Sequence, residues 1–291
     1  MIILLKSVLG VLTAVYGLVF SVDFAKNKDK LSKASWLGLG GTGFVSNFFD
    51  TLGIGSFAQQ TAIFKFFKLV DDRFIPGTLH VGNTIPTICQ AFIFMTVIEV
   101  APLTLACLAI TAPIGAVLGA GVVAKMPKRK IQLGLGLALL AVALAMLASL
   151  LKFFPLGGMA TGLDGWKLVL AGAVTFVLGA IHTIGVGFFA PCMALIYALG
   201  MSPRVAFPIM MTSTAMIIST ASLRFIREKV HDRKASLALM ISGIGGVLVA
   251  AYLIVSLPLT ILKWVVLAVI LYAAAVMLRS AARKKGSDLH I

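Results

Sequence analysis

Apolar residues run along this chain in nine long segments, separated by short polar and basic stretches. The segments cover approximately residues 3–22, 37–69, 76–98, 102–124, 131–151, 166–200, 204–226, 235–257 and 261–279. Most can cross a hydrocarbon core about 30 Å thick, which takes roughly 20 helical residues. The segments do not alternate with a period of two, as the strands of a membrane barrel would. The pattern therefore predicts an all-α polytopic membrane protein.

Two of these segments are too long for one ordinary crossing. Residues 37–69 and 166–200 would each measure about 50 Å as a continuous helix. Each also contains a Gly-x-Gly step near its centre, where glycine lets the backbone leave the helix. Two structures fit this pattern: a long tilted span, or a hairpin that dips into the membrane and returns to the same side.

The two long segments are also related in sequence. Thr51-Leu-Gly-Ile-Gly-Ser-Phe-Ala58 returns without a gap, 132 residues later, as Thr183-Ile-Gly-Val-Gly-Phe-Phe-Ala190, and Pro76 returns in phase as Pro208. Internal copies that contain interrupted helices are typical of transporters whose substrate lies between the copies.

The basic residues favour the hairpins. If both long segments are hairpins, 20 of the 25 Lys and Arg fall on one side, and five fall on the other: Lys6, Lys152, Lys167, Arg204 and Lys263. Basic residues concentrate on the cytoplasmic side of membrane proteins. The sequence therefore predicts an inverted-topology repeat with two broken, re-entrant helices and about seven transmembrane helices.

This topology divides the chain into four parts. Residues 1–36 form an extra N-terminal transmembrane helix, with residue 1 outside, and a basic loop. Residues 37–151 form repeat one, residues 166–280 form repeat two, and residues 281–291 form a cytoplasmic tail. We interpret residues 1–22 as an uncleaved helix, with a removed signal peptide as the alternative.

Composition excludes several classes of protein. The chain is 60% hydrophobic with a mean hydropathy of +1.05, and only 12% of its residues are charged. The basic residues that give the net charge of +15 lie in loops, where they set the orientation of the protein in the membrane and contact anionic lipid. We therefore do not expect a nucleic-acid partner. The three cysteines lack CxxC spacing, which argues against a disulfide framework and a zinc site. The chain lacks GxxxxGK[ST], HExxH and GxSxG motifs, so we expect neither direct ATP drive, nor an enzyme, nor a cofactor.

The two Gly-x-Gly steps are the predicted substrate site. A half-helix that begins at Ser56 or Phe188 points unpaired backbone N–H groups and a positive dipole end into the protein. Two such ends form an anion site without any Lys or Arg. The residues predicted to form it are Gly53, Gly55, Ser56, Thr183, Gly185 and Gly187.

Asp50 and His182 occupy the same position in the two repeats, three residues before the first glycine. Ionisable groups within a membrane are costly and are candidates for function. One hypothesis is a proton-coupling pair beside the substrate, because histidine titrates near neutrality. The alternative is a buried Asp–His contact that only holds the two hairpins together.

Further polar residues lie at matching depth in the apolar segments. Their hydroxyl, amide and imidazole groups are neutral donors that suit an oxyanion, but they also suit ordinary helix–helix hydrogen bonds. A second hypothesis is a cation or metal-ion transporter that uses Asp50, His80, Asn83 and His182 as ligands. The further candidates for substrate binding are Gln59, Gln60, His80, Asn83, Thr84, Thr212 and Ser213.

The duplicated pattern resembles the sulfite exporter TauE/SafE family. Repeat two shows it best, in Gly179-Ala-Ile-His-Thr-Ile-Gly-Val-Gly187, then Met201-Ser-Pro-Arg-Val-Ala206 and Thr212-Ser213. Repeat one matches more loosely, at Gly53-Ile-Gly-Ser56 and at His80-Val81, where the family has Thr-Ser. The resemblance implies a secondary transporter in the bacterial inner membrane that exports a sulfur-containing anion such as sulfite or an organosulfonate. The expected partners are this anion, membrane lipid and, as a homodimer, a second copy of the chain.

Overall fold

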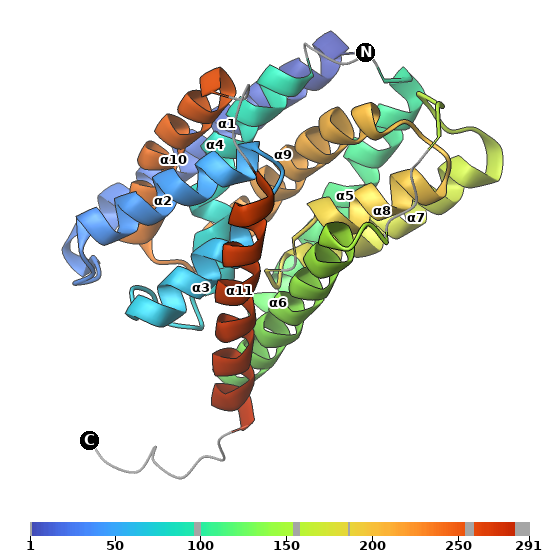
Figure 1. Ribbon diagram of the computed structural model, residues 1–291. Coiled ribbons are helices and arrows are strands. Elements are labelled where there is room, and N and C mark those ends of the chain that lie inside the picture. Colours follow the sequence, from blue (N-terminus) through green and yellow to red (C-terminus); the bar gives the residue numbers. More distant parts are fainter. Residues whose placement is uncertain (1, 96–99, 154–157, 186, 254–258, 283–291) are drawn as a thin grey trace.

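The computed structural model describes residues 2–95, 100–153, 158–185, 187–253 and 259–282, and the regular elements of these residues are helices (Figure 1). The first repeat and the residues before it contain α1 Ile2–Lys26, the short 3-10 helix η1 Lys28–Lys30, α2 Trp36–Thr51, α3 Phe57–Phe67, α4 Ile75–Phe94, α5 Pro102–Val123 and α6 Lys128–Leu150. The rest contains α7 Gly165–His182, α8 Phe189–Ala198, α9 Pro203–Arg227, α10 Arg233–Leu253 and α11 Leu259–Ala282.

Five of the described helices are long and apolar enough to cross a membrane. They are Ile3–Lys26, Pro102–Val123, Gly165–His182, Val205–Arg227 and Arg233–Tyr252. Large apolar side chains also cover the outer surface of these helices, as on α5, where Ile110, Ile114, Leu118 and Val122 are exposed. Such a surface is stable in lipid rather than in water. The prediction of an all-α polytopic membrane protein is confirmed.

Each of the two long apolar segments consists of two helices. α2 ends at Thr51 and α3 begins at Phe57; α7 ends at His182 and α8 begins at Phe189. Gly53, Gly55 and Gly185 have φ values of 86°, 88° and 111°, which side chains other than glycine rarely adopt. We name residues 52–56 the first break and residues 183–188 the second break; residue 186 lies outside the described residues.

The helices of the two halves correspond in order. Each helix from α7 to α11 begins within four residues of the position 132 residues after the start of its counterpart, from α2 to α6. The half-helices α3 and α8 also end alike, because Lys68 and Gly200 both have a positive φ. One start differs: Pro203 opens α9 about one turn early, so Pro208 lies inside α9, whereas Pro76 lies in the first turn of α4.

The packing follows the same correspondence. α2 packs on α10 as α7 packs on α5, α4 contacts α9, and α6 contacts α11 (Figure 1). Glycines permit the closest approaches: a Cβ at Gly179 on α7 would overlap the carbonyl of Ala112 on α5, and one at Gly246 on α10 would overlap the carbonyl of Phe44 on α2. Gly115 and Gly119 lie against α7 in the same way, as expected for a small-xxx-small contact.

The central helix is α9, and α1 is attached beside it. Of an 18-residue window of α9, 89% is buried within the protein, against 22% for α1. α1 is joined by Tyr16, whose hydroxyl donates to the Val81 carbonyl at 2.5 Å, and by Asp23, which accepts two hydrogen bonds from Arg233 at 2.7 and 3.0 Å.

Candidate functional site

At the first break, a carboxylate of the protein itself accepts a hydrogen bond from the backbone at the start of α3. Asp50 is buried, and its Oδ1 accepts a hydrogen bond from the backbone N–H of Ser56 at 2.7 Å. Its Oδ2 accepts from the side-chain amide of Gln90 at 3.0 Å, and this amide also donates to the Thr51 hydroxyl. Asp50 therefore occupies the N-terminal end of α3, where the sequence analysis expected a substrate anion.

Behind this break lies a buried cluster of amides. Asn83 and Gln60 exchange two hydrogen bonds, at 2.6 and 2.8 Å, and Asn47 donates to the same oxygen of Asn83 at 2.8 Å. Gln60 also donates to Ser46. The donors of Asn83 and Gln60 are thus used within the protein, and this cluster ties α2, α3 and α4 together.

The two breaks meet at a cluster of aromatic and imidazole rings. Phe57, the first residue of α3, stacks on His182, the last residue of α7, with ring centroids 4.6 Å apart. His80 from α4 lies edge-on to both rings, at 5.0 Å from Phe57 and 5.2 Å from His182. Phe188 and Phe225 complete the cluster. His182, at the end of α7 in repeat two, therefore contacts Phe57, at the start of α3 in repeat one.

His80 has one engaged and one unengaged ring nitrogen. Its Nδ1 lies 2.7 Å from the Pro76 carbonyl, and a carbonyl can only accept, so Nδ1 is the protonated donor. Its Nε2 is buried and has no hydrogen-bond partner among the described residues. Thr84 donates to the His80 carbonyl and contacts the Ser222 hydroxyl at 2.9 Å.

Three successive hydroxyls on α9 are also unengaged. Thr212, Ser213 and Thr214 are buried, and their hydroxyls have no partner among the residues that the structure describes. Several other helical hydroxyls donate to the carbonyl four residues earlier, as Ser46, Ser219 and Thr220 do, whereas Thr87 and Ser236 also lack a partner among the described residues. A buried hydroxyl without a partner is costly, so each of these three is a candidate ligand contact, although successive helical residues point about 100° apart and the three do not share one face.

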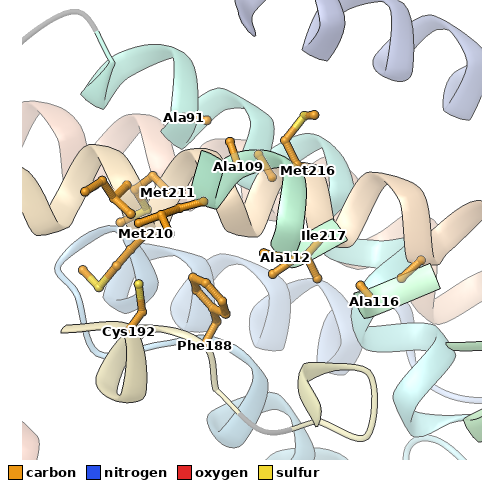
Figure 2. Close-up of a cluster of buried hydrophobic side chains, with 14 of the residues drawn as sticks. Ala91, Ala109, Ala112, Ala116, Phe188, Cys192, Met210, Met211, Met216 and Ile217 are labelled. Atoms are coloured by element: carbon orange, nitrogen blue, oxygen red, sulfur yellow. The ribbon is translucent and has the colours of Figure 1, made fainter. Parts of the chain in front are cut away.

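The same part of α9 borders both breaks. Phe207 lies beside Gly53, where a Cβ would come within 3.5 Å of its ring. A few residues on, Met210 and Met211 gather with Phe188 and Cys192 (Figure 2). The surroundings of the second break are therefore apolar and sulfur-rich, whereas those of the first break are rich in amides.

The remaining predicted residues have local roles. Gln59 donates to the Gly55 carbonyl at 2.6 Å, and Thr183 donates to the Ala180 carbonyl at 2.7 Å. Gly187 is half-buried. Among the residues described, no group of three or more His, Cys, Asp or Glu could hold a metal ion.

Sequence reasoning missed several members of the site. Hydrogen bonds around the first break also involve Ser46, Asn47 and Gln90. On α9, Thr214 carries the third hydroxyl without a partner among the described residues. Amides inside apolar segments are themselves a signal, since polar groups are costly in a membrane. Phe57 and Phe225 gave no such signal, because phenylalanine is common throughout these segments.

The comparison with protein families agrees with the resemblance in the sequence. Residues 167–290 match the family described as sulfite exporter TauE/SafE. The match supports the family resemblance for this part of the chain. The matched residues include the whole second break, α8, α9 and the hydroxyls of Thr212 and Ser213. No curated protein and no solved structure matches the chain.

The match to this family and the apolar helices support an integral membrane protein, and the matched family is one of exporters of sulfite-type anions. The geometry described above then limits where such an anion is able to bind.

Proposed function

We propose that this protein is a secondary transporter that moves a small sulfur-containing anion, such as sulfite or an organosulfonate, out of the cell by alternating access. The observation behind this proposal is that the buried hydroxyls of Thr212, Ser213 and Thr214 have no partner among the described residues, and that they lie on the segment of α9 that borders both breaks. Neutral donors suit a weakly hydrated oxyanion, and they release it more easily than a Lys or Arg would.

The proposed topology is the inverted repeat. In it, α2 and α3 form a hairpin that enters from the cytoplasm, and α7 and α8 form one that enters from outside, with the C-terminus in the cytoplasm of a bacterial cell. The order of the helices, the exchange of packing partners and the contact of Phe57 with His182 support this arrangement.

We choose the proposed binding residues from the buried polar groups that have no hydrogen-bond partner among the described residues. Asp50 already caps α3, and the amides of Gln60 and Asn83 bond to each other. We therefore place the anion on the side of the second break, between the α9 hydroxyls and the start of α8. Its other predicted contacts are His80, Thr183, Gly185 and Gly187.

The cation hypothesis is less well supported by this geometry. Its four ligands divide into separate groups, since Asp50 accepts from Ser56 and Gln90, Asn83 bonds to Gln60, and only His80 and His182 lie together. A carboxylate that accepts two hydrogen bonds from the protein has fewer free lone pairs for a metal ion.

The test is a flux assay in proteoliposomes with sulfite, thiosulfate, sulfoacetate and taurine, and with chloride and divalent cations for comparison. We expect flux with one of the sulfur anions. Thr212→Val combined with Ser213→Ala should lower that flux at least about tenfold, because a hydrogen bond to a charged group contributes about 1.5–3 kcal/mol.

Ser219→Ala is the matched control. Ser219 lies on the same helix and is equally buried, but its hydroxyl donates to the Ala215 carbonyl and is not available to a ligand. Its flux should stay close to that of the unmodified protein. Flux of cations alone, or an equal loss in both variants, would contradict the proposed function.

A further inference from the structure

The rings of His80 and His182 contact each other at the meeting point of the two breaks. Their centroids are 5.2 Å apart with an interplanar angle of 67°, and both side chains are buried. Asp50, the other ionisable group near the first break, is held by Ser56 and Gln90. The geometry therefore argues against the hypothesis that Asp50 and His182 form a proton-coupling pair.

We infer that the His80–His182 pair, and not Asp50, holds the proton that is coupled to transport, and that Nε2 of His80 is the atom that binds it. This inference rests on the proposed function. Nδ1 of His80 keeps its own proton, which it donates to the Pro76 carbonyl. The second proton therefore adds to the buried, unengaged Nε2 and leaves from the same atom.

The rings that contact His80 are one imidazole and two phenyl rings. α7 presents His182, α3 presents Phe57 and α9 presents Phe225. α1 presents Tyr16, whose hydroxyl donates to the carbonyl of Val81, next to His80. In this apolar environment a proton on His80 is an uncompensated positive charge. An anion beside it supplies the compensation.

This coupling also defines the substrate class. One proton balances one negative charge, so the transported species is a monoanion, such as hydrogensulfite or a sulfonate, rather than a dianion. Transport of one monoanion with one proton in the same direction moves no net charge, so export runs down the concentration gradient of the anion and carries the proton out with it. Two imidazoles in ring contact repel each other when both are charged, so the pair binds one proton at a time.

The experiment compares proton-driven uptake with gradient-free exchange in proteoliposomes. An imposed difference of one pH unit should drive accumulation of the monoanion up to about tenfold in the unmodified protein, since one proton moves with each anion. In His80→Gln this accumulation should disappear, whereas exchange of labelled for unlabelled anion, which needs no net proton movement, should fall by a smaller factor than accumulation does.

Asp50→Asn is the matched control. It removes a buried charge from the same region but keeps an oxygen that accepts from Ser56. We expect its exchange rate to change while its proton-driven accumulation remains. Accumulation that survives in His80→Gln, or is abolished in Asp50→Asn alone, would overturn the inference but not the proposed function.

A second measurement needs no variant. A membrane potential set by valinomycin and potassium should leave the uptake of the monoanion unchanged in the unmodified protein, because the proton cancels its charge. Uptake that follows the potential would overturn the inference. Absence of flux for every anion tested would instead overturn the proposed function itself, and the inference with it.

Discussion

At the scale of single residues, the buried polar side chains fall into two groups. Those around the first break, such as Asp50, Gln60 and Asn83, are joined by hydrogen bonds within the protein. Those on α9, from Thr212 to Thr214, are not joined to any described residue. Since an unengaged buried donor costs stability, the first group stabilises the fold and the second is the better candidate for function.

His231 gives a prediction for pH dependence at this scale. It lies in the loop between α9 and α10, with Nε2 3.5 Å from Asp23 and beside Arg233. Burial lowers the pKa of His231 from 6.5 to about 4, although Asp23 acts in the opposite direction. The neutral ring is therefore favoured in the folded protein, and protonation favours the unfolded one.

This contribution to stability should be complete above pH 6.5 and should be lost as the pH falls toward about 4. The measurement is the thermal unfolding midpoint of the purified protein in detergent at pH 7.5, 6 and 5. His231→Gln should flatten the dependence in this range. The same slope in both proteins would show that other groups cause it.

At the scale of elements, the breaks depend on glycine conformation and the helix contacts depend on glycine size. Gly53, Gly55 and Gly185 supply the positive φ values that end α2 and α7. Gly115, Gly119 and Gly179 have ordinary helical conformations and instead let α5 and α7 approach closely. In lipid, where apolar surface gives little driving force between helices, such close packing is a main source of stability.

Gly179→Ala tests the packing of α5 on α7. Its Cβ would overlap the Ala112 carbonyl, which cannot move without displacing α5. We expect a loss of about 1–3 kcal/mol, as for other overpacked sites, and a lower thermal unfolding midpoint.

The matched control is Gly17→Ala on α1, where a Cβ would meet nothing within 4 Å. This change should leave the midpoint unchanged or raise it slightly, because alanine favours helix more than glycine does. Equal losses in the two variants would mean that the close approach of α5 and α7 contributes little.

At the scale of the whole molecule, the order and packing of the helices are those of two related halves. Helices α2 to α6 of the first half correspond in order to α7 to α11 of the second half. The contact of α2 with α10 therefore corresponds to the contact of α7 with α5. The chemistry is not duplicated, because amides surround the first break and methionine, cysteine and phenylalanine surround the second. We therefore expect one substrate position nearer to the second break rather than two equivalent positions.

Single-cysteine labelling tests the proposed topology. In a variant without Cys89, Cys107 and Cys192, we expect Lys68→Cys to react with an impermeant maleimide only from the cytoplasmic side and Met159→Cys only from outside. Both positions are exposed, and they precede and follow the spans of repeat one. If the two long segments simply crossed the membrane, both results would be reversed.

Much of the fold could be predicted from the sequence, because each feature has a local cause. Long apolar segments require helices in a membrane, and glycines at 53, 55 and 185 permit a chain to leave the helix. The similarity between residues 51–58 and 183–190 indicated two related halves, and the resemblance of repeat two to the sulfite exporter TauE/SafE family is confirmed for residues 167–290.

Tertiary structure decided which polar groups are engaged. Asp50 and His182 hold the same position in their repeats, and this equivalence suggested a pair. In the structure Asp50 accepts from Ser56, six residues ahead, and from Gln90 on α4, while His182 packs on Phe57 and His80. The sequence by itself determined which groups are buried in the membrane. Only the packing of α2, α3 and α4 determined which of them found a hydrogen-bond partner, because most of those partners come from another helix.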